Sequence, residues 1–568
     1  MIDFFTRRLR EALSGRQGSQ GIRNPPLAAA RPLFPAAIAN VAAMNPRRTA
    51  GVPAESFIWN ADIAARSATG LDADAVLRVA RQRNPGITQR QVDAIERAVQ
   101  RHLAIWWGPP GTGKSATAQG FLAGSLASAA EQGTGLRIAI TAVTWVAIEH
   151  VARKLPEILQ QLGLADRVLL ARLVSRAETA GQIAPELEPF VLAMDDRDAA
   201  DRVDLEAALN ARDSLVVVAS TVDQIAKLGR AVLEPMFDLM LIDEASQVDV
   251  AHAIVGFTKL APDARVVVVG DDLQMAPIHP IEPPEGAGHL VGSIFDFYRN
   301  YRGEGLERTM LDRSFRSNRE IIDFVKLAGY PDLHASERTA GLRFATARPI
   351  VARRPATWPA ELAFSPALSA ILDPEQPLAA VVHTDRYSSQ RNQEEADLVA
   401  GMVLALFDAG LMDIDDGNRT ALSPVDFFRK GLGIVTPHRA QQAAVFERLS
   451  AALAGRVDEN EIFAAVDTVE RFQGQEKTVM IASFGLGDKD QIAAEETFLF
   501  NLNRFNVTAS RAKAKFVAIM SRKLVDHLPS DKEALIQSRL LKHFVDGFLR
   551  RSEPISVPGF PECHLHGR

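Results

Sequence analysis

The chain has 568 residues, of which 47% are hydrophobic and 24% are charged, a composition typical of globular proteins with several buried cores. Its 64 lysines and arginines against 70 aspartates and glutamates give a formal net charge of -6, which argues against indiscriminate polyanion binding but allows a local basic groove. The single cysteine, Cys563, excludes an internal disulfide.

The N-terminal residues 1–53 are predicted to form a flexible arm. It begins with an amphipathic stretch, MIDFFTRRLREAL, and continues in a region rich in Gly, Pro, Ala and Arg without periodicity. A docking helix is the favoured interpretation of the first stretch, and an arginine-rich organellar presequence is the minority one. No apolar run is long enough to cross a bilayer, and the N-terminus lacks the apolar core of a secretory signal. A cytoplasmic protein without a membrane partner is therefore expected.

Residues 54–86 are predicted as a helical lead-in, with helical patterning from Ala73 to Gln82. Beyond it, over 87–305, short β-rich runs alternate with helical stretches, which predicts a parallel sheet covered by helices on both faces. The expected strands contain AIWW, RIAIT, LVVVAS, FDLMLID and RVVVVG. A charged, mostly helical insert is expected at about 151–212, where the strand rhythm is interrupted.

A second α/β series of similar character is predicted over 306–545, with AAVVHT, GLGIVT, VMIASF and FVAIMS as its buried strands. The fold class is therefore α/β, with two tandem domains built on parallel sheets. Residues 546–568 are expected to be a solvated tail. Its Cys563, His564 and His566 look like metal ligands, but a tetrahedral site would need another donor.

A phosphate-binding loop follows the first predicted strand, Leu103–Trp107, and precedes a predicted helix, Ala116–Leu126. It consists of Gly108, Pro109, Pro110, Gly111, Thr112, Gly113, Lys114 and Ser115. Glycines let backbone N–H groups surround phosphates, a lysine neutralises the β/γ charge, and a serine hydroxyl ligates Mg²⁺. The pattern predicts ATP and Mg²⁺ as ligands.

Two carboxylates follow the predicted strand Phe237–Ile242, at the edge of the sheet where ligands of open α/β sheets bind. Asp243 is expected in the Mg²⁺ shell. Glu244 is the natural general base for the attacking water.

With these residues, DEASQ at 243–247 resembles motif II of the superfamily 1 helicases, and further motifs follow in that family's order over about 87–521. The resemblance implies two RecA-like P-loop domains with ATP hydrolysed between them. ITQRQVDAI resembles the Q motif, which implies that Gln91 reads the adenine edge. A surface glutamine is the plain alternative.

The resemblance also supplies groups that contact the nucleotide. VVVVGDDLQMAPI resembles motif III, with Gln274 as the γ-phosphate sensor, although Met-Ala follows where Leu-Pro is commoner. LDRSFRSN and NLNRFNVTASRAKAKF resemble motifs IV and VI, which implies that Arg316 and Arg511 stabilise the transition state from the second domain. Glu476 is implied to face the ribose.

Contacts to nucleic acid are implied at Thr141, Thr221, Thr436, Thr468 and Gln473. A capping or turn bond is an equally good interpretation of the Thr436 and Thr468 hydroxyls, and Trp145 could stack on a base or pack under the following helix. VDTVERFQGQEKTVMIAS, GIVTPHRAQ and the run Asn392–Ala396 resemble branch 1B, which contains the nonsense-mediated-decay RNA helicase and senataxin. That branch implies movement from 5′ to 3′.

The leading hypothesis is a monomeric motor on single-stranded nucleic acid or a tailed duplex, DNA or RNA. The alternative is an ATP-switched scaffold subunit without autonomous unwinding, attached to partner proteins through the arm or the insert. No strand-separating pin is identifiable in the sequence.

Overall fold

The computed structural model describes residues 56–59, 66–176, 183–195, 200–211, 213–229, 235–274, 292–301, 305–351, 353–415, 419–470, 472 and 475–568. The expected N-terminal arm lies outside these residues. The chain divides into two compact units. The first consists of 1–108, 113–272 and 276–311, and the second of 109–112, 273–275 and 312–568.

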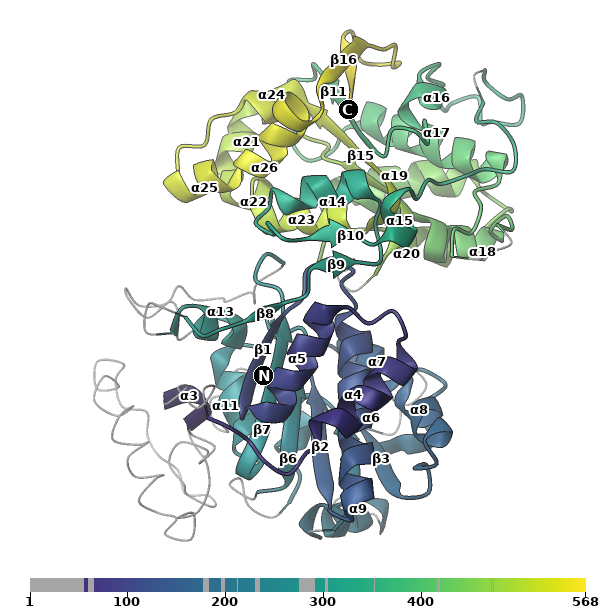
Figure 1. Ribbon diagram of the computed structural model, residues 1–568. Coiled ribbons are helices and arrows are strands. Elements are labelled where there is room, and N and C mark those ends of the chain that lie inside the picture. Colours follow the sequence, from purple (N-terminus) through teal and green to yellow (C-terminus); the bar gives the residue numbers. More distant parts are fainter. Residues whose placement is uncertain are drawn as a thin grey trace. The chain divides into compact units, whose positions relative to one another are not determined.

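The first unit is built on an eight-stranded sheet with the order β4-β3-β5-β2-β6-β7-β1-β8, in which every pairing is parallel (Figure 1). The strands are β1 (Leu103–Trp107), β2 (Leu136–Thr141), β3 (Val168–Val174), β4 (Val191–Ala193), β5 (Leu215–Ala219), β6 (Phe237–Ile242), β7 (Leu260–Gly270) and β8 (Thr309–Met310). Five of them, β1, β2, β5, β6 and β7, contain the predicted runs. The predicted α/β fold class is confirmed.

Helices cover both faces of this sheet because alternate strand residues point to opposite sides. Trp106 packs with one set and Ile105 with the other. The first set is α4 (Ala73–Arg83), α5 (Gln89–Gln100), α6 (Lys114–Gln132), α7 (Trp145–Ala152) and α8 (Leu155–Gln161). The second set is α3 (Ser56–Trp59), α9 (Ala200–Asn210), α10 (Val222–Ile225), α11 (Val250–Phe257) and α13 (Ile294–Arg299). A short 3-10 turn, η4 (Glu188–Phe190), precedes β4.

The structure corrects the expectation of a mostly helical insert at 151–212. Besides α8 and α9 it contains β3 and β4, which extend the parallel sheet beyond β5. A charged residue within the strand hid this pattern. The Arg172 side chain is fully buried, donates to the carbonyls of Leu173 and Ala219, and lies 4.5 Å from the centre of the Trp145 ring. Trp145 therefore packs inside the unit, as its alternative interpretation proposed.

The second unit has a seven-stranded sheet with the order β13-β12-β14-β15-β11-β17-β16. The first five strands in this order are parallel, whereas β17 is antiparallel to both its neighbours. The strands are β11 (Leu378–His383), β12 (Leu432–Val435), β13 (Val466–Asp467), β14 (Lys477–Ser483), β15 (Ala512–Ser521), β16 (Arg551–Pro554) and β17 (Cys563–Gly567). A separate ribbon pairs β9 (Arg313–Ser314) with β10 (His334–Ala335).

The helices of this unit pack in two groups. One apolar core contains residues of α16 (Leu368–Ile371), α17 (Gln393–Ala409), η6 (Phe427–Gly431), α19 (Arg439–Ala452) and α20 (Glu459–Ala465). A ring cluster joins α14 (Arg319–Lys326), α23 (Leu502–Ser510), β15 and η7 (Phe544–Phe548) through Phe324, Phe505, Phe516 and Phe544. The remaining helices are α15 (Glu337–Ala340), α18 (Pro424–Asp426), α21 (Lys489–Ala494), α22 (Glu496–Leu499), α24 (Arg522–Asp526), α25 (Lys532–Gln537) and α26 (Arg539–His543). None of the described helices is long and apolar enough to cross a membrane.

The expected solvated tail is wrong. Residues 551–567 contribute β16 and β17, and β17 lies between β11 and the edge strand β16 of the second sheet. Cys563 and Leu565 are each only 2% exposed. The short strand was missed because its sequence, CHLHG, contains two histidines, of which His566 is buried.

Replacing Leu565 with Ala is expected to destabilise the second unit by about 2–5 kcal/mol, because the deletion leaves a cavity against β11. Hydrogen exchange of β11 amides during urea titration measures this loss. The control is Leu528→Ala, since Leu528 is 72% exposed. Equal stability of the two variants would show that the C-terminal strand does not stabilise the sheet.

Candidate functional site

The phosphate-binding loop joins β1 to the N-terminus of α6. Gly111 and Gly113 have φ of +74° and +77°, a left-handed conformation that glycine adopts without strain. Helix α6 is 19 residues long, and no side chain caps its N-terminus, so its first N–H groups remain available for an anion. The Lys114 ammonium donates to the Gly108 carbonyl at 2.7 Å. The geometry therefore suits a polyphosphate, as the sequence predicts.

Backbone hydrogen bonds fix the acidic pair at the same edge of the first sheet. The Gly108 N–H donates to the Gly270 carbonyl at the end of β7, and the Asp243 N–H donates to the Thr141 carbonyl at the end of β2, both at 2.9 Å. Since β6 neighbours β7 and β7 neighbours β1, the loop and the carboxylates follow strands separated by one strand. Parallel strands thus bring the two motifs to one edge.

Asp243 is only 4% exposed. Burial, and then the negative charge of Glu244, raise the pKa of Asp243 to about 7, while Lys114 acts in the opposite direction. A buried carboxyl of this kind is stabilised in its ionised form by a cation beside it. Asp243 therefore fits the predicted role of a Mg²⁺ ligand, with the half-buried Ser115 next to Lys114 as the second group.

Glu244 combines two unusual features. Its φ is +47°, a conformation that is strained for a residue with a side chain. Its Oε2 is buried and has no hydrogen-bond partner among the described residues. A buried carboxylate oxygen is costly to leave unpaired, so the position suits a group that is supplied by a ligand, such as the attacking water. These observations agree with the role predicted for Glu244.

In the second unit, Arg316 lies beside Glu476. Its Nε donates to the Glu476 carboxylate at 2.8 Å, and Lys513 forms a second ion pair with that carboxylate at 2.9 Å. Burial alone raises the pKa of Glu476, but the two cations outweigh it and hold the pKa at about 2. Glu476 is therefore ionised and forms ion pairs with Arg316 and Lys513. Its side chain is 43% exposed, and its contact with a ribose stays a prediction.

Arg316 also donates to the Ser510 carbonyl at 3.1 Å, which joins motif IV to motif VI. The neighbouring Arg511 is 3% exposed. Within the second unit, which includes 273–275, its Nη2 donates to the Gln274 Oε1 at 3.1 Å. The structure thus brings together Arg316, Arg511 and Gln274, the three residues assigned to the γ-phosphate.

Gln91 is not the surface glutamine of the plain interpretation, because it is 1% exposed. It closes a capping box at the start of α5. Its Oε1 accepts from the Thr88 N–H at 3.0 Å, and its own N–H donates to the Thr88 hydroxyl at 3.2 Å. In this structure the side-chain carbonyl of Gln91 is therefore used to cap the N-terminus of α5.

The predicted nucleic-acid contacts divide by burial. Thr141 and Thr436 are fully buried, and the Thr436 hydroxyl donates to the His438 carbonyl in a turn, so neither is available to a strand in this structure. Thr221 and Thr468 are half-buried. Gln473 lies outside the described residues. Each of these two threonines lies at the end of a parallel strand, and its contact with nucleic acid stays a prediction.

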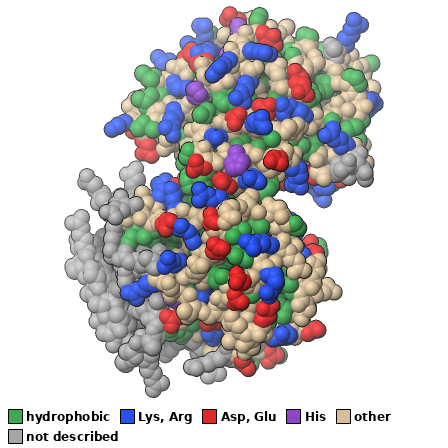
Figure 2. All heavy atoms as spheres, viewed as in Figure 1, with side chains coloured by type: hydrophobic (Ala, Val, Ile, Leu, Met, Phe, Trp, Pro, Cys, Tyr) green, Lys and Arg blue, Asp and Glu red, His purple; other side chains and the backbone are tan. Residues whose placement is uncertain are grey.

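Thr144, near motif Ia, lies on the surface, unlike Thr141. It is exposed, as are Val143 and Val146, and its hydroxyl caps the start of α7 by accepting from the Ala147 N–H. A threonine directly before an apolar helical run is an N-capping signal that marks the start of the helix. On the face drawn in Figure 2, basic and acidic side chains are interspersed over each unit.

Two family models match this chain, both described as an AAA domain, over residues 91–280 and 293–523. Among curated relatives, the mouse (Mus musculus) DNA replication ATP-dependent helicase/nuclease DNA2 is 24% identical over 78% of this chain and 38% of its own length. The Arabidopsis thaliana regulator of nonsense transcripts 1 homolog is 21% identical over 78% of this chain and 33% of its own length. The chain thus spans less than half of these relatives.

Solved structures with some likeness include RecG bound to a three-way DNA junction, with 12% identity, a TM-score of 0.38, and coverage of 86% of this chain and 49% of that chain. The arterivirus nonstructural protein 10 helicase in complex with DNA has 12% identity, a TM-score of 0.33, and coverage of 83% and 66%. The sequence matches agree with the order of the motifs and with the two α/β units that carry them. Together with the order of the motifs, these matches support a superfamily 1 DNA/RNA helicase of branch 1B.

Proposed function

We propose that this chain is an ATP-driven motor that moves along single-stranded nucleic acid and unwinds tailed duplexes. The observation that carries the proposal is the edge of the first sheet, where the uncapped N-terminus of α6 accompanies Asp243 and the unpaired Glu244 oxygen. This combination suits hydrolysis of a nucleoside triphosphate rather than binding alone, because a general base has no role in a binding site.

The first unit supplies the groups that bind and activate. The N–H groups of the loop hold the phosphates, and Lys114 offsets the charge on the β- and γ-phosphates. Ser115 and Asp243 would hold Mg²⁺, which supplies charge neutralisation when it is bound. Glu244 orients the attacking water and accepts its proton.

The second unit supplies the arginines. By similarity to the family, Arg316 and Arg511 would stabilise the charge that spreads over the transferred phosphoryl group, and Gln274 would sense the γ-phosphate. The proposed mechanism therefore needs both RecA-like units, so that hydrolysis is coupled to their movement. Glu476 would hold the Arg316 guanidinium in position, since the two side chains form an ion pair.

The choice of nucleic acid and the polarity are further parts of the proposal. The printed names of the relatives include both a DNA replication helicase/nuclease and a regulator of nonsense transcripts, so they support a nucleic-acid track without choosing between DNA and RNA. Movement from 5′ to 3′ and function as a monomer are proposed from the resemblance to branch 1B.

The test is the ATPase activity of the purified chain with no nucleic acid, with single-stranded DNA and with RNA of matched sequence. We expect strand-dependent stimulation, followed by unwinding of 5′-tailed but not 3′-tailed duplexes. Stimulation without strand displacement would instead support the ATP-switched scaffold. An ATPase that neither strand stimulates would contradict the motor.

A further inference from the structure

The loop that follows β11, residues 384–392, presents an aromatic side chain to solvent. Tyr387 is 88% exposed, the highest value among the large hydrophobic side chains that the structure describes. The other three tyrosines pack inside: Tyr298 and Tyr330 are fully buried, and Tyr301 packs against the core of the first unit. The exposure of Tyr387 thus needs an explanation beyond composition.

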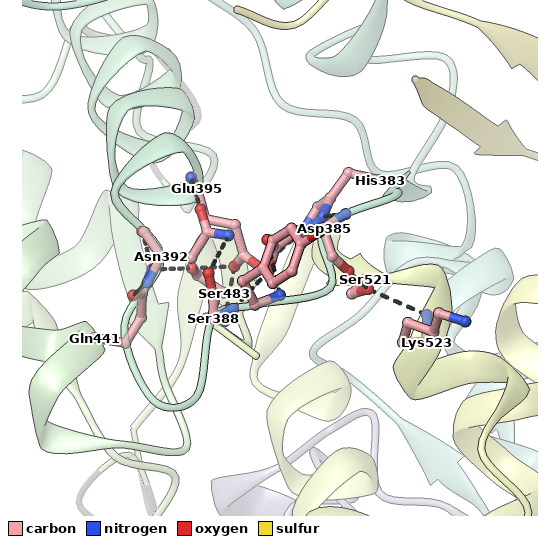
Figure 3. A network of polar contacts seen from close by, with 11 residues as sticks. His383, Asp385, Ser388, Asn392, Glu395, Gln441, Ser483, Ser521 and Lys523 are labelled. Atoms are coloured by element: carbon pink, nitrogen blue, oxygen red, sulfur yellow. Dashed lines mark hydrogen bonds and ion pairs between the residues drawn. The ribbon is translucent and has the colours of Figure 1, made fainter. Parts of the chain in front are cut away.

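The backbone of this loop is held in place around Tyr387. The Asp385 carboxylate accepts from the N–H groups of Tyr387 and Ser388 at 3.3 and 3.2 Å. The Ser388 carbonyl accepts from the Gly487 N–H at 2.7 Å, and the Asp385 carbonyl accepts from the Ser521 hydroxyl at 2.6 Å (Figure 3). A side chain at position 487 would collide with Asp385, so glycine allows this close approach. The loop is therefore preorganised.

A buried polar network lies at the two ends of the loop. His383 and Glu395 are both fully buried, with 2.9 Å between His383 Nε2 and Glu395 Oε1. The other oxygen of Glu395 accepts from the Ser483 hydroxyl at 2.7 Å and the Gly485 N–H at 3.0 Å, and the Phe560 ring stacks on His383 at 4.0 Å. A fully satisfied network of this kind favours one conformation, because any other would leave buried polar groups without hydrogen bonds.

The far end of the loop is tied to the same network (Figure 3). The Asn392 amide donates to the Ser388 hydroxyl at 3.0 Å, and the Asn392 N–H donates to Gln441 at 2.7 Å. Gln441 in turn donates to Ser483 at 2.9 Å. Asn392 and Glu395 belong to the NQEEA run of branch 1B. In this structure the run serves to hold the loop.

The loop lies beside the turn that follows β12. Gln390 donates to one oxygen of Glu495 at 3.0 Å, and His438 Nε2 lies 2.6 Å from the other oxygen. His438 is part of GIVTPHRAQ, so the Tyr387 loop and this motif share one anchor at the carboxyl edge of the second sheet. Arg386, next to Tyr387, is exposed, as is Lys523 at the start of α24.

We propose that Tyr387 stacks on a base of the bound single strand and thereby supplies the aromatic contact that the sequence did not reveal. The inference rests on the proposed function and adds to it one residue that contacts the nucleic acid. Stacking accepts any base, which suits a motor that ignores sequence, and the adjacent Arg386 complements a phosphate. A rigid loop lowers the entropy lost on binding.

The test compares Tyr387→Ala, Tyr387→Phe and, as the control, Leu528→Ala, an exposed apolar residue of the same unit. We expect Tyr387→Ala to weaken binding of fluorescein-labelled oligo(dT) and oligo(U) about tenfold, and Tyr387→Phe to bind within about twofold of the wild type. An oligonucleotide that contains 5-iodouracil should form a photocrosslink to residue 387, identified by mass spectrometry.

The outcomes distinguish failure of the inference from failure of the proposed function. If the wild type binds the strand and Tyr387→Ala binds equally well, the inference is overturned while the motor stands. Equal weakening of the Phe and Ala variants would also overturn it, since the ring would then not carry the contact. A wild type that binds neither oligonucleotide overturns the motor and the inference together.

Discussion

The variant Glu244→Gln is expected to bind ATP but to turn it over about 10²–10⁴-fold more slowly than the wild type. Glutamine keeps the size of the side chain and can still accept a hydrogen bond, but it cannot take a proton from water. The Glu244 oxygen that has no partner among the described residues is the one placed to receive it. ATP affinity should stay within about threefold, because phosphate binding relies on the loop and Lys114.

The measurement pairs strand-stimulated ATPase rates with binding of a fluorescent ATP analogue. Glu131→Gln is the matched control, since Glu131 is an exposed carboxylate of the same unit that pairs with Arg78. Hydrolysis by Glu244→Gln at the rate of this control would exclude Glu244 as the base and require another group to activate water.

The parts of the fold that were predicted from sequence are those whose signals are local. Strands β1, β5, β6 and β7 are nearly continuous apolar runs because both faces of a parallel sheet are covered. The phosphate-binding loop has a fixed spacing, and the acidic pair follows its strand directly. These positions could be assigned without knowing which strands are neighbours.

The rest depended on distant contacts. Arg172 makes β3 look like surface, yet its charge is compensated by the Ala219 carbonyl of β5 and by the Trp145 ring and the Glu149 carboxylate of α7. β17 is a strand only because β11 offers an edge to it. The burial of Thr141 follows from the central place of β2 in the strand order, and the role of Glu395 from its pairing with His383 across twelve residues. None of these partners can be identified from a local sequence pattern.

The variant Lys114→Ala is expected to lose activity by a different route. Removing the ammonium leaves the β/γ charge uncompensated in both the bound and the reacting state. Hydrolysis should therefore fall about 10²–10³-fold, and affinity for the ATP analogue should fall with it, whereas Glu244→Gln lowers the rate alone. Lys154→Ala, which changes an exposed lysine of the same unit, is the control for a general loss of charge.

The contrast between the two variants distinguishes a motor from a switch. In a motor, Lys114→Ala and Glu244→Gln both stop strand displacement, because each cycle of movement needs one hydrolysis. In a scaffold that only binds ATP, Glu244→Gln keeps ATP-dependent binding of the strand while Lys114→Ala loses it. Full unwinding by Glu244→Gln would contradict the motor, since movement would then be independent of the proposed chemistry.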